Sequence, residues 1–231
     1  VTYLEGSDDI INTTGINELY RKQRNLDFKS NVWEAYLALE LFPTMMFRRD
    51  KTYEPKLRPY ALLGIGIFHF NPKGSLTDAA GNKTWYELHP LRLEGQGMSE
   101  YPDSKPYKLT QINIPMGAGL KYYASERIHL STELLYRKTF TDYIDDVSKN
   151  YIDPNDFSKY LSAGDAANAY KLSDKVQPII FPGMTRFPAG NQRGDSKDGD
   201  TYLSLVLKLG IRLGSIYQNS AMKQTRCPVV Y

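Results

Sequence analysis

The segment 201–214 constrains the fold of this chain more than any other part of the sequence. Every odd-numbered position from Leu203 to Leu213 holds Leu or Ile, whereas the even-numbered positions hold Tyr, Ser, Val, Lys, Gly and Arg. Because successive side chains of a β-strand point to opposite faces, this alternation predicts a strand with one apolar face and one polar, cationic face. Strands of transmembrane barrels show this pattern, with the apolar face toward lipid.

Four further segments, 33–41, 59–70, 111–122 and 128–140, repeat the alternation. Each is about ten residues long or more, which is enough for a tilted strand to cross a bilayer. A soluble β-sandwich would pack its apolar faces together, but it would not explain charges that recur on the opposite face of four strands. We therefore predict an all-β fold, a small antiparallel transmembrane up-and-down β-barrel.

The number of strands suggests that the natural barrel is larger. Residues 1–5 resemble the end of a further strand, which brings the total to six, whereas outer-membrane barrels have eight or more strands. We expect eight strands, with about two N-terminal strands preceding Val1, and a removed export signal. No run of 18 apolar residues is present, so the sequence does not predict a transmembrane helix.

The segments between the expected strands alternate between long and short. Long external loops and short periplasmic turns are typical of outer-membrane barrels. Residues 1–214 are therefore expected to form a transmembrane barrel with long extracellular loops at 6–31, 71–106 and 141–199, and residues 215–231 to form a periplasmic C-terminal tail. Within the longest loop, the alanine-rich stretch 155–172 predicts a short helix.

Charged side chains recur on the predicted inner faces of the strands. The expected ion-pair network of the lumen consists of Glu34, Glu40, Glu133, Lys121, Arg137, Lys208 and Arg212, with Arg58 on the same face. A small barrel is filled by its side chains, and an unpaired buried charge is costly, so opposite charges should pair. Glycines at 64, 66, 117 and 119 are expected to make room for bulky neighbours. A selective pore is the alternative.

The sequence offers little support for catalysis. The three histidines, His69, His89 and His129, are expected at separate places along the barrel. His89 with Asp103 or Glu94 could form a base and its orienting group, but no serine nucleophile motif accompanies them. We expect no enzymatic activity and no cofactor.

Two acidic stretches invite a metal-site interpretation. Residues 195–200 lack the full ligand pattern and closing glutamate of a calcium loop, which favours a solvated turn. Asp142, Asp145 and Asp146 lie near Tyr143 and Tyr151, and we expect them to form a hydrogen-bonded loop base rather than a metal site. The tripeptide 193–195, Arg-Gly-Asp, is interpreted as a coincidence.

The predicted tail contains the single cysteine of the chain. Cys227 is flanked by Arg226 and Pro228, and Tyr217 and Tyr231 lie in the same tail. In an oxidising periplasm an unpaired cysteine could form a disulfide with a partner, pair within the natural chain, or remain a free thiol. These five residues are expected to contact a partner protein.

Several stretches together resemble one known family. They are residues 24–30 followed by 34–40, residues 58–68 with 71–74, residues 141–148 with Tyr151, and the terminal Cys227-Pro228. They resemble the PorG family of Bacteroidota outer-membrane barrels, which are components of the type IX secretion system. The stretch Asp-Tyr-Ile-Asp-Asp-Val-Ser at 142–148 is the most specific match. The first strands of the family, with a Tyr-x-Gly-Asp type motif, have no counterpart in this chain.

The resemblance implies an eight-stranded barrel in the bacterial outer membrane, without catalysis. It implies attachment to a periplasmic ring of a PorK-like lipoprotein and a PorN-like subunit. A partner disulfide of Cys227 would link the chain to this ring. Outer-membrane lipid and lipopolysaccharide would surround the barrel, and no basic cluster with stacking aromatics predicts nucleic-acid binding. A small porin or solute channel, or a surface adhesin that acts through its long loops, are the alternatives.

Overall fold

A computed structural model describes residues 1–8, 15–46, 55–177, 179–197 and 199–213. The chain forms two compact units. The first unit comprises residues 1–37, 64–115 and 137–202, and the second comprises residues 38–63, 116–136 and, in its described part, 203–213. The longer strands contribute residues to both units.

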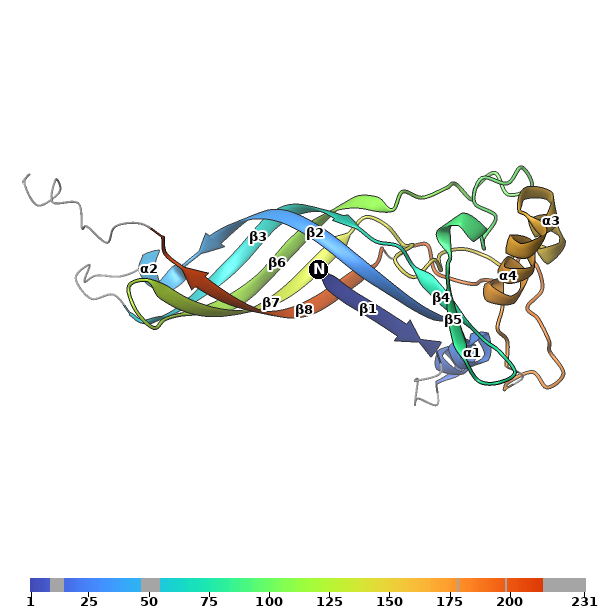
Figure 1. Cartoon of the computed structure of the whole chain (residues 1–231), viewed down its shortest axis with the longest axis horizontal. Coiled ribbons are helices and arrows are strands. Elements are labelled where there is room, and N and C mark those ends of the chain that lie inside the picture. Colours follow the sequence, from blue (N-terminus) through green and yellow to red (C-terminus); the bar gives the residue numbers. More distant parts are fainter. Residues whose placement is uncertain (9–14, 47–54, 178, 198, 214–231) are drawn as a thin grey trace, which may run out of the picture. The chain divides into compact units, whose positions relative to one another are not determined.

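The structure is mostly an antiparallel β-sheet (Figure 1). The strands are β1 (Thr2–Ser7), β2 (Asp27–Leu41), β3 (Leu57–His69), β4 (Lys73–Thr77), β5 (Lys83–Glu87), β6 (Thr110–Tyr123), β7 (Ile128–Thr139) and β8 (Thr201–Ile211). Their order in the sheet is β5-β4-β2-β3-β6-β7-β8, and β1 also pairs with β2. The five alternating segments and the short segment at the start of the chain therefore all form strands, as predicted.

The helices are short. They are α1 (Ile16–Arg24), α2 (Pro43–Met46), α3 (Phe157–Tyr160) and α4 (Ala163–Ser173), with single 3₁₀ turns at η2 (His89–Leu91) and η3 (Pro154–Asp156). The hydroxyl of Ser162 accepts a hydrogen bond from the backbone N–H of Asp165 and caps α4. This helix confirms the prediction from the alanine-rich stretch. None of the described helices has both the length and the apolar character needed to cross a membrane.

The predicted loop 6–31 is too long at both ends. β1 continues to Ser7, and β2 already begins at Asp27, because the antiparallel ladder pairs these two residues. The sequence pattern missed this extension because Asp27, Lys29 and Asn31 are polar. Backbone hydrogen bonds, which do not depend on apolar side chains, hold this part of the ladder.

The predicted loop 71–106 is also partly wrong, because it contains the hairpin of β4 and β5. The two strands pair from Lys73↔Glu87 to Thr77↔Lys83, and Lys73 also pairs with Lys29 of β2. Each strand has only five residues. A search for bilayer-length alternation does not detect strands this short, so the expected total of six strands was too low.

A closed barrel is not shown among the described residues. β8 stands at one end of the strand order, and β1 covers β2 only from Asp27 to Val32. β2, β3, β6, β7 and β8 follow one another in both the chain and the sheet, apart from the inserted hairpin. This order is that of a meander, the connectivity from which up-and-down barrels are built.

The apolar faces of the long strands are exposed in both units. Leu37 of the first unit has 81% of its surface exposed, and Leu207 of the second has 80%. The other large exposed side chains on these strands are Trp33, Ile65, Ile67, Ile112, Leu39, Leu41, Leu57, Leu63, Leu120, Tyr122, Ile128, Leu130, Leu134, Tyr136, Leu203, Leu205, Leu209 and Ile211. Contiguous apolar patches of this extent mark surfaces that contact another protein or a membrane.

Buried apolar clusters of the first unit lie where its connecting segments pack. One cluster joins η2, the 91–98 segment, α3 and α4 (Figure 1), and consists of Leu88, Leu91, Leu93, Met98, Ile152, Phe157, Ala169 and Leu172. A second joins strand ends to the 141–148 segment and consists of Val32, Phe68, Phe70, Ile144 and Tyr202. The long connections are therefore a folded part of the molecule.

Candidate functional site

The polar faces of the strands carry paired charges. In the first unit, the Nε of Arg137 donates to both carboxylate oxygens of Glu34, at 2.9 and 2.7 Å. The Nδ2 of Asn113 donates to the same carboxylate at 2.6 Å, and the Arg137 guanidinium lies 5.1 Å from the ring centre of Tyr202. Both charged side chains are buried, and their hydrogen bonds to each other and to Asn113 compensate for the loss of water.

The second unit holds two further pairs. Lys121 donates to Glu40 at 2.5 Å. Lys208 donates to Glu133 at 2.7 Å, and the hydroxyl of Tyr60 donates to the same Glu133 oxygen at 2.5 Å. Six of the seven residues predicted for the lumen network are therefore brought together as opposite-charge pairs.

The seventh residue, Arg212, is not joined to the others among the described residues. It follows the end of β8 with an exposed side chain, and its backbone N–H donates to the carbonyl of Arg127 at 2.7 Å. Arg58 lies with its guanidinium 4.3 Å from the ring centre of Tyr123 and donates to the carbonyl of Pro55 at 3.0 Å. The alternation of β8 assigned Arg212 to the polar face, but it could not show where the strand would end.

Glycines on the polar faces make space for large side chains. A Cβ at Gly119 would lie 2.6 Å from the Cζ of Tyr60, and a Cβ at Gly66 would lie 2.4 Å from the Oδ1 of Asn113. These contacts are shorter than van der Waals distance, so any larger residue would displace the neighbour. The predicted role of these two glycines is confirmed.

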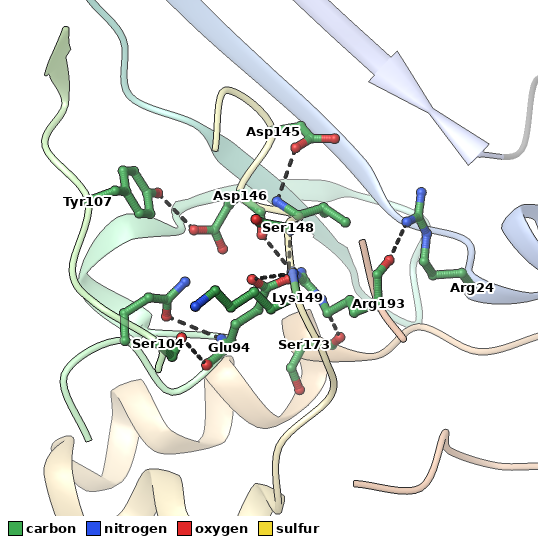
Figure 2. Close-up of polar contacts among 12 residues, drawn as sticks. Arg24, Glu94, Ser104, Tyr107, Asp145, Asp146, Ser148, Lys149, Ser173 and Arg193 are labelled. Carbon is green, nitrogen blue, oxygen red and sulfur yellow. Dashed lines mark hydrogen bonds and ion pairs between the residues drawn. The ribbon is translucent and has the colours of Figure 1, made fainter. Parts of the chain in front are cut away.

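A second polar cluster lies in the connecting segments of the first unit and is centred on Glu94 and Arg193 (Figure 2). Glu94 is 1% exposed and Arg193 is 3% exposed. The Nη1 of Arg193 donates to the Oε1 of Glu94 at 2.9 Å and to the carbonyl of Asp146 at 2.5 Å. Its Nε donates to the carbonyl of Ser173 at 3.3 Å. One guanidinium thus joins three separate stretches of the chain.

The stretch 142–148 is held by this cluster. The backbone N–H groups of Ser148 and Lys149 donate to the two oxygens of Glu94, each at 2.9 Å. Asp146 has a positive φ of 61°, and its carboxylate accepts from the hydroxyl of Tyr107 at 2.7 Å. Asp145 accepts from the backbone N–H of Val147 at 3.0 Å. The predicted hydrogen-bonded loop base is confirmed for Asp145 and Asp146, whereas an oxygen of Asp142 and the hydroxyls of Tyr143 and Tyr151 are buried without a hydrogen-bond partner in the described part of the chain.

Arg24 extends the cluster toward β1 and β2 (Figure 2). Its Nη1 donates to the backbone carbonyl of Arg193 at 2.6 Å. Its Nε and Nη2 donate to the two oxygens of Asp8 at 2.7 and 2.9 Å, a bidentate pair. The same carboxylate accepts from the backbone N–H of Leu26 at 3.1 Å. The start of β2 is therefore tied to the 141–199 segment.

Aromatic rings complete this region. Tyr107 stacks on Tyr143 with ring centres 4.4 Å apart and on Phe70 at 6.1 Å. The Nε2 of His89 is 3.0 Å from the carbonyl oxygen of Tyr107. Among the described residues, His89 forms no hydrogen bond with Asp103 or Glu94, and the Glu94 carboxylate is engaged by Arg193.

Burial changes the proton affinity of the carboxyls in this region. It raises the pKa of Asp145 and of Asp146 to about 7, and the pKa of Asp142 and of Asp200 to about 6. One carboxylate oxygen of Asp146 is buried without a hydrogen-bond partner in the described part of the chain. A protonated, neutral Asp146 fits that environment better than an ionised one.

Three predictions remain: the acidic stretch 195–200, the tripeptide 193–195 and the partner-binding residues of the tail. Asp195 is exposed and accepts from the backbone N–H of Lys197 at 3.2 Å, as the predicted solvated turn requires. Asp200 instead is half-buried and accepts from the backbone N–H of Ile144, which is distant in the chain, at 2.8 Å. Arg193 is buried, so the Arg-Gly-Asp tripeptide does not present its arginine. The predicted partner-binding residues Tyr217, Arg226, Cys227, Pro228 and Tyr231 lie outside the described residues.

Sequence reasoning missed the ion pairs Glu94–Arg193 and Asp8–Arg24. The partners in each pair are far apart in the chain, and none of the four lies in an alternating segment. In the sequence, Arg24 is distinguished only as part of the family-like stretch 24–30. Residue type and local spacing carried no signal that these charges would meet.

We predict that Arg193→Met loosens the loop base without unfolding the strands. Removing one partner of a buried ion pair costs about 3–5 kcal/mol, because Glu94 would remain buried and unpaired. Hydrogen exchange of the peptide that contains Ser148 and Lys149 should accelerate strongly. The control is Lys159→Met, which removes the ion pairs of an exposed lysine with Glu100 and Asp156 and should therefore change exchange much less. Equal effects of the two variants would contradict the role assigned to Arg193.

We also predict that the loop base is less stable at about pH 8 than at about pH 5. An unfolded aspartate titrates near pKa 3.9, whereas Asp146 folds with its pKa raised to about 7. Between these values the folded state binds more protons, so stability falls as pH rises. Asp146→Asn should reduce this slope, measured as hydrogen exchange corrected for intrinsic rates. The exposed Asp103→Asn is the control, and an unchanged slope in Asp146→Asn would refute the assignment.

Comparison with known proteins gives no relative: no family model, no curated protein and no solved structure matches the chain significantly.

Proposed function

We propose that this chain is a β-barrel protein of the bacterial outer membrane that anchors a protein secretion complex. The observation that carries the proposal is the exposed apolar face of the long strands, with Leu37 and Leu207 each about four-fifths exposed. In water, each Å² of apolar surface left exposed costs about 25 cal/mol of free energy, so a water-soluble protein would bury such faces. Lipid covers them without a protein partner.

The strand pattern supports a barrel rather than an open sheet. Backbone groups at an uncovered sheet edge cannot be satisfied in the hydrocarbon region, so a sheet in a membrane has to close. The edges at β8 and at the second half of β2 then pair with further strands. We propose an eight-stranded up-and-down barrel, in which the segments 71–106 and 141–199 face the exterior.

The polar face supports an anchor rather than a channel. Its charged residues form the pairs Glu34–Arg137, Glu40–Lys121 and Glu133–Lys208. Neighbouring side chains fill the space beside Gly66 and Gly119. An eight-stranded barrel is just wide enough for its interior side chains to fill. Stable unitary conductance in a planar bilayer would instead favour a small porin or solute channel.

The type IX secretion assignment rests on the resemblance of stretches 24–30, 58–68 and 141–148 to the PorG family. Two of these stretches are linked through Arg193, whose carbonyl accepts from Arg24 and whose guanidinium donates to the carbonyl of Asp146. In the proposed function, the barrel holds a PorK-like and PorN-like ring through its periplasmic face. The tail with Cys227 is the segment that we assign to this contact.

A surface-binding function is the second candidate. The folded loop segments favour it, since Leu88, Phe157 and Leu172 form an apolar cluster of their own. Such a structured cap could present a binding surface. Deleting part of the segment 165–188 would then abolish ligand binding and leave secretion intact.

We predict that Leu207→Lys impairs assembly into the membrane. A lysine on the lipid face near the bilayer midplane costs about 2–4 kcal/mol, and this cost falls to about 0–1 kcal/mol near the interface. Leu213→Lys, at the end of the same apolar run and also highly exposed, is therefore the matched control. The measurement is the fraction of protein in the protease-resistant membrane form. A soluble, folded Leu207→Lys protein would contradict membrane insertion.

Trapping of a disulfide at Cys227 tests the attachment to a periplasmic partner. Outer membranes are isolated with thiols blocked, and native protein is compared with Cys227→Ser on non-reducing gels. A covalent adduct to a periplasmic protein that is lost in the variant is the expected result. If the gels show only monomer, chemical cross-linking of the native protein decides the question, and recovery of no ring protein would contradict the anchor function.

A further inference from the structure

A pocket of about 460 Å³ lies where the exposed apolar face of β2 and β3 ends in the first unit. Along β2 this face runs from Leu37 through Trp33 to Asn31 and Lys29, since these positions share one side of the strand. The pocket is lined by Tyr3, Lys29, Trp33, His69, Lys73 and Trp85, among others. Apolar residues thus give way to aromatics and then to lysines.

Two lysines occupy directly opposite ladder positions in the lining of this pocket. Lys29 of β2 and Lys73 of β4 are direct partners in the antiparallel ladder. Like charges directly opposite one another destabilise a sheet. An anion bound between them would reduce this repulsion. The same row of the sheet also holds Glu5, opposite Lys29, and Glu87, opposite Lys73.

The neighbouring carboxylates leave this charge pair incompletely neutralised. Glu87 lies 3.3 Å from the Nζ of Lys73, but both side chains are about half exposed, so the pair is weak. Glu5 is the ladder partner of Lys29, and its carboxylate accepts from the hydroxyl of Tyr3 at 2.9 Å. Lys29 directs its ammonium to the ring of Trp85, 4.0 Å from the ring centre.

Aromatic side chains give the pocket a second property. Tyr3 and Trp33 are exposed and border the apolar face, whereas Trp85 lies on the short strand β5 beside the lysines. Tyr and Trp are enriched at the level of lipid headgroups, where one part of the ring contacts acyl chains and the other contacts water. An occupant of this pocket therefore has an apolar part along the strands and an anionic part at the lysines.

We propose that this pocket binds the phosphorylated headgroup of an outer-leaflet lipid, with the phosphate between Lys29 and Lys73 and the acyl chains along the apolar face below Trp33. This inference deepens the proposed function and rests on it, since the lipid is available only to a protein in the membrane. Charge complementarity selects the phosphate, and the adjoining apolar face selects a lipid over a free anion.

The test is binding of a phosphorylated glycolipid to the native protein in detergent micelles, counted by native mass spectrometry. The ligands are a diphosphorylated acylated glucosamine disaccharide, its dephosphorylated form, and inorganic phosphate. Native protein should bind the phosphorylated lipid most tightly. Lys29→Gln/Lys73→Gln should weaken this binding about tenfold or more, because two charge-assisted contacts are lost.

The matched control is Lys105→Gln/Lys108→Gln, which removes two exposed positive charges outside the pocket. It should bind the lipid as the native protein does. Equal weakening in both double variants would show that only net charge matters and would overturn the site. Equal binding of the phosphorylated and dephosphorylated lipids, or full competition by inorganic phosphate at similar concentration, would also overturn it.

Membrane incorporation is measured separately, and the two proposals can therefore fail separately. Both double variants should enter the outer membrane as the native protein does, because neither changes the apolar strand faces. Native protein that is absent from membranes would refute the proposed function. Native protein that is incorporated but does not discriminate for phosphate would refute only the lipid site.

Discussion

The alternation of apolar and polar side chains along the long strands is the constraint on which the structure depends. Because of this alternation, each strand has one apolar face and one charged face. In β8, Leu207 is exposed and Lys208 pairs with Glu133. A water-soluble fold would bury the apolar faces in its core. Here the ion pairs lie on the opposite faces, and the apolar faces are exposed.

The second organising interaction is the buried pair Glu94–Arg193. Its guanidinium joins the carbonyls of Asp146 and Ser173, while its carboxylate holds the backbone of the 148–149 turn. Long segments without regular structure lose much conformational entropy when they are ordered. A few fully satisfied buried charges and two small apolar clusters offset this loss, which makes the connections a defined surface.

The proposed lipid site and the loop base both depend on the 71–106 connection, whose structure the alternation does not reveal. Lys73 and Trp85 reach the pocket only because β4 and β5 form a hairpin beside β2. The same connection, 71–106, also delivers Glu94 to Arg193. One inserted segment thus supplies residues to the rim of the apolar face and to the centre of the loops.

The sequence by itself determined the long strands, their two unlike faces and the charges that would share a face, because a period of two is a local property of the backbone. It also located α4 from its alanines. Only the tertiary structure decided which charges pair, that Arg193 is buried against Glu94, and that Lys29 stands opposite Lys73. These contacts join residues distant in the chain. Pairing of β2 with the inserted hairpin brings Lys29 and Lys73 together, and packing of the connecting segments brings Glu94 and Arg193 together, and neither can be read from the pattern of one segment.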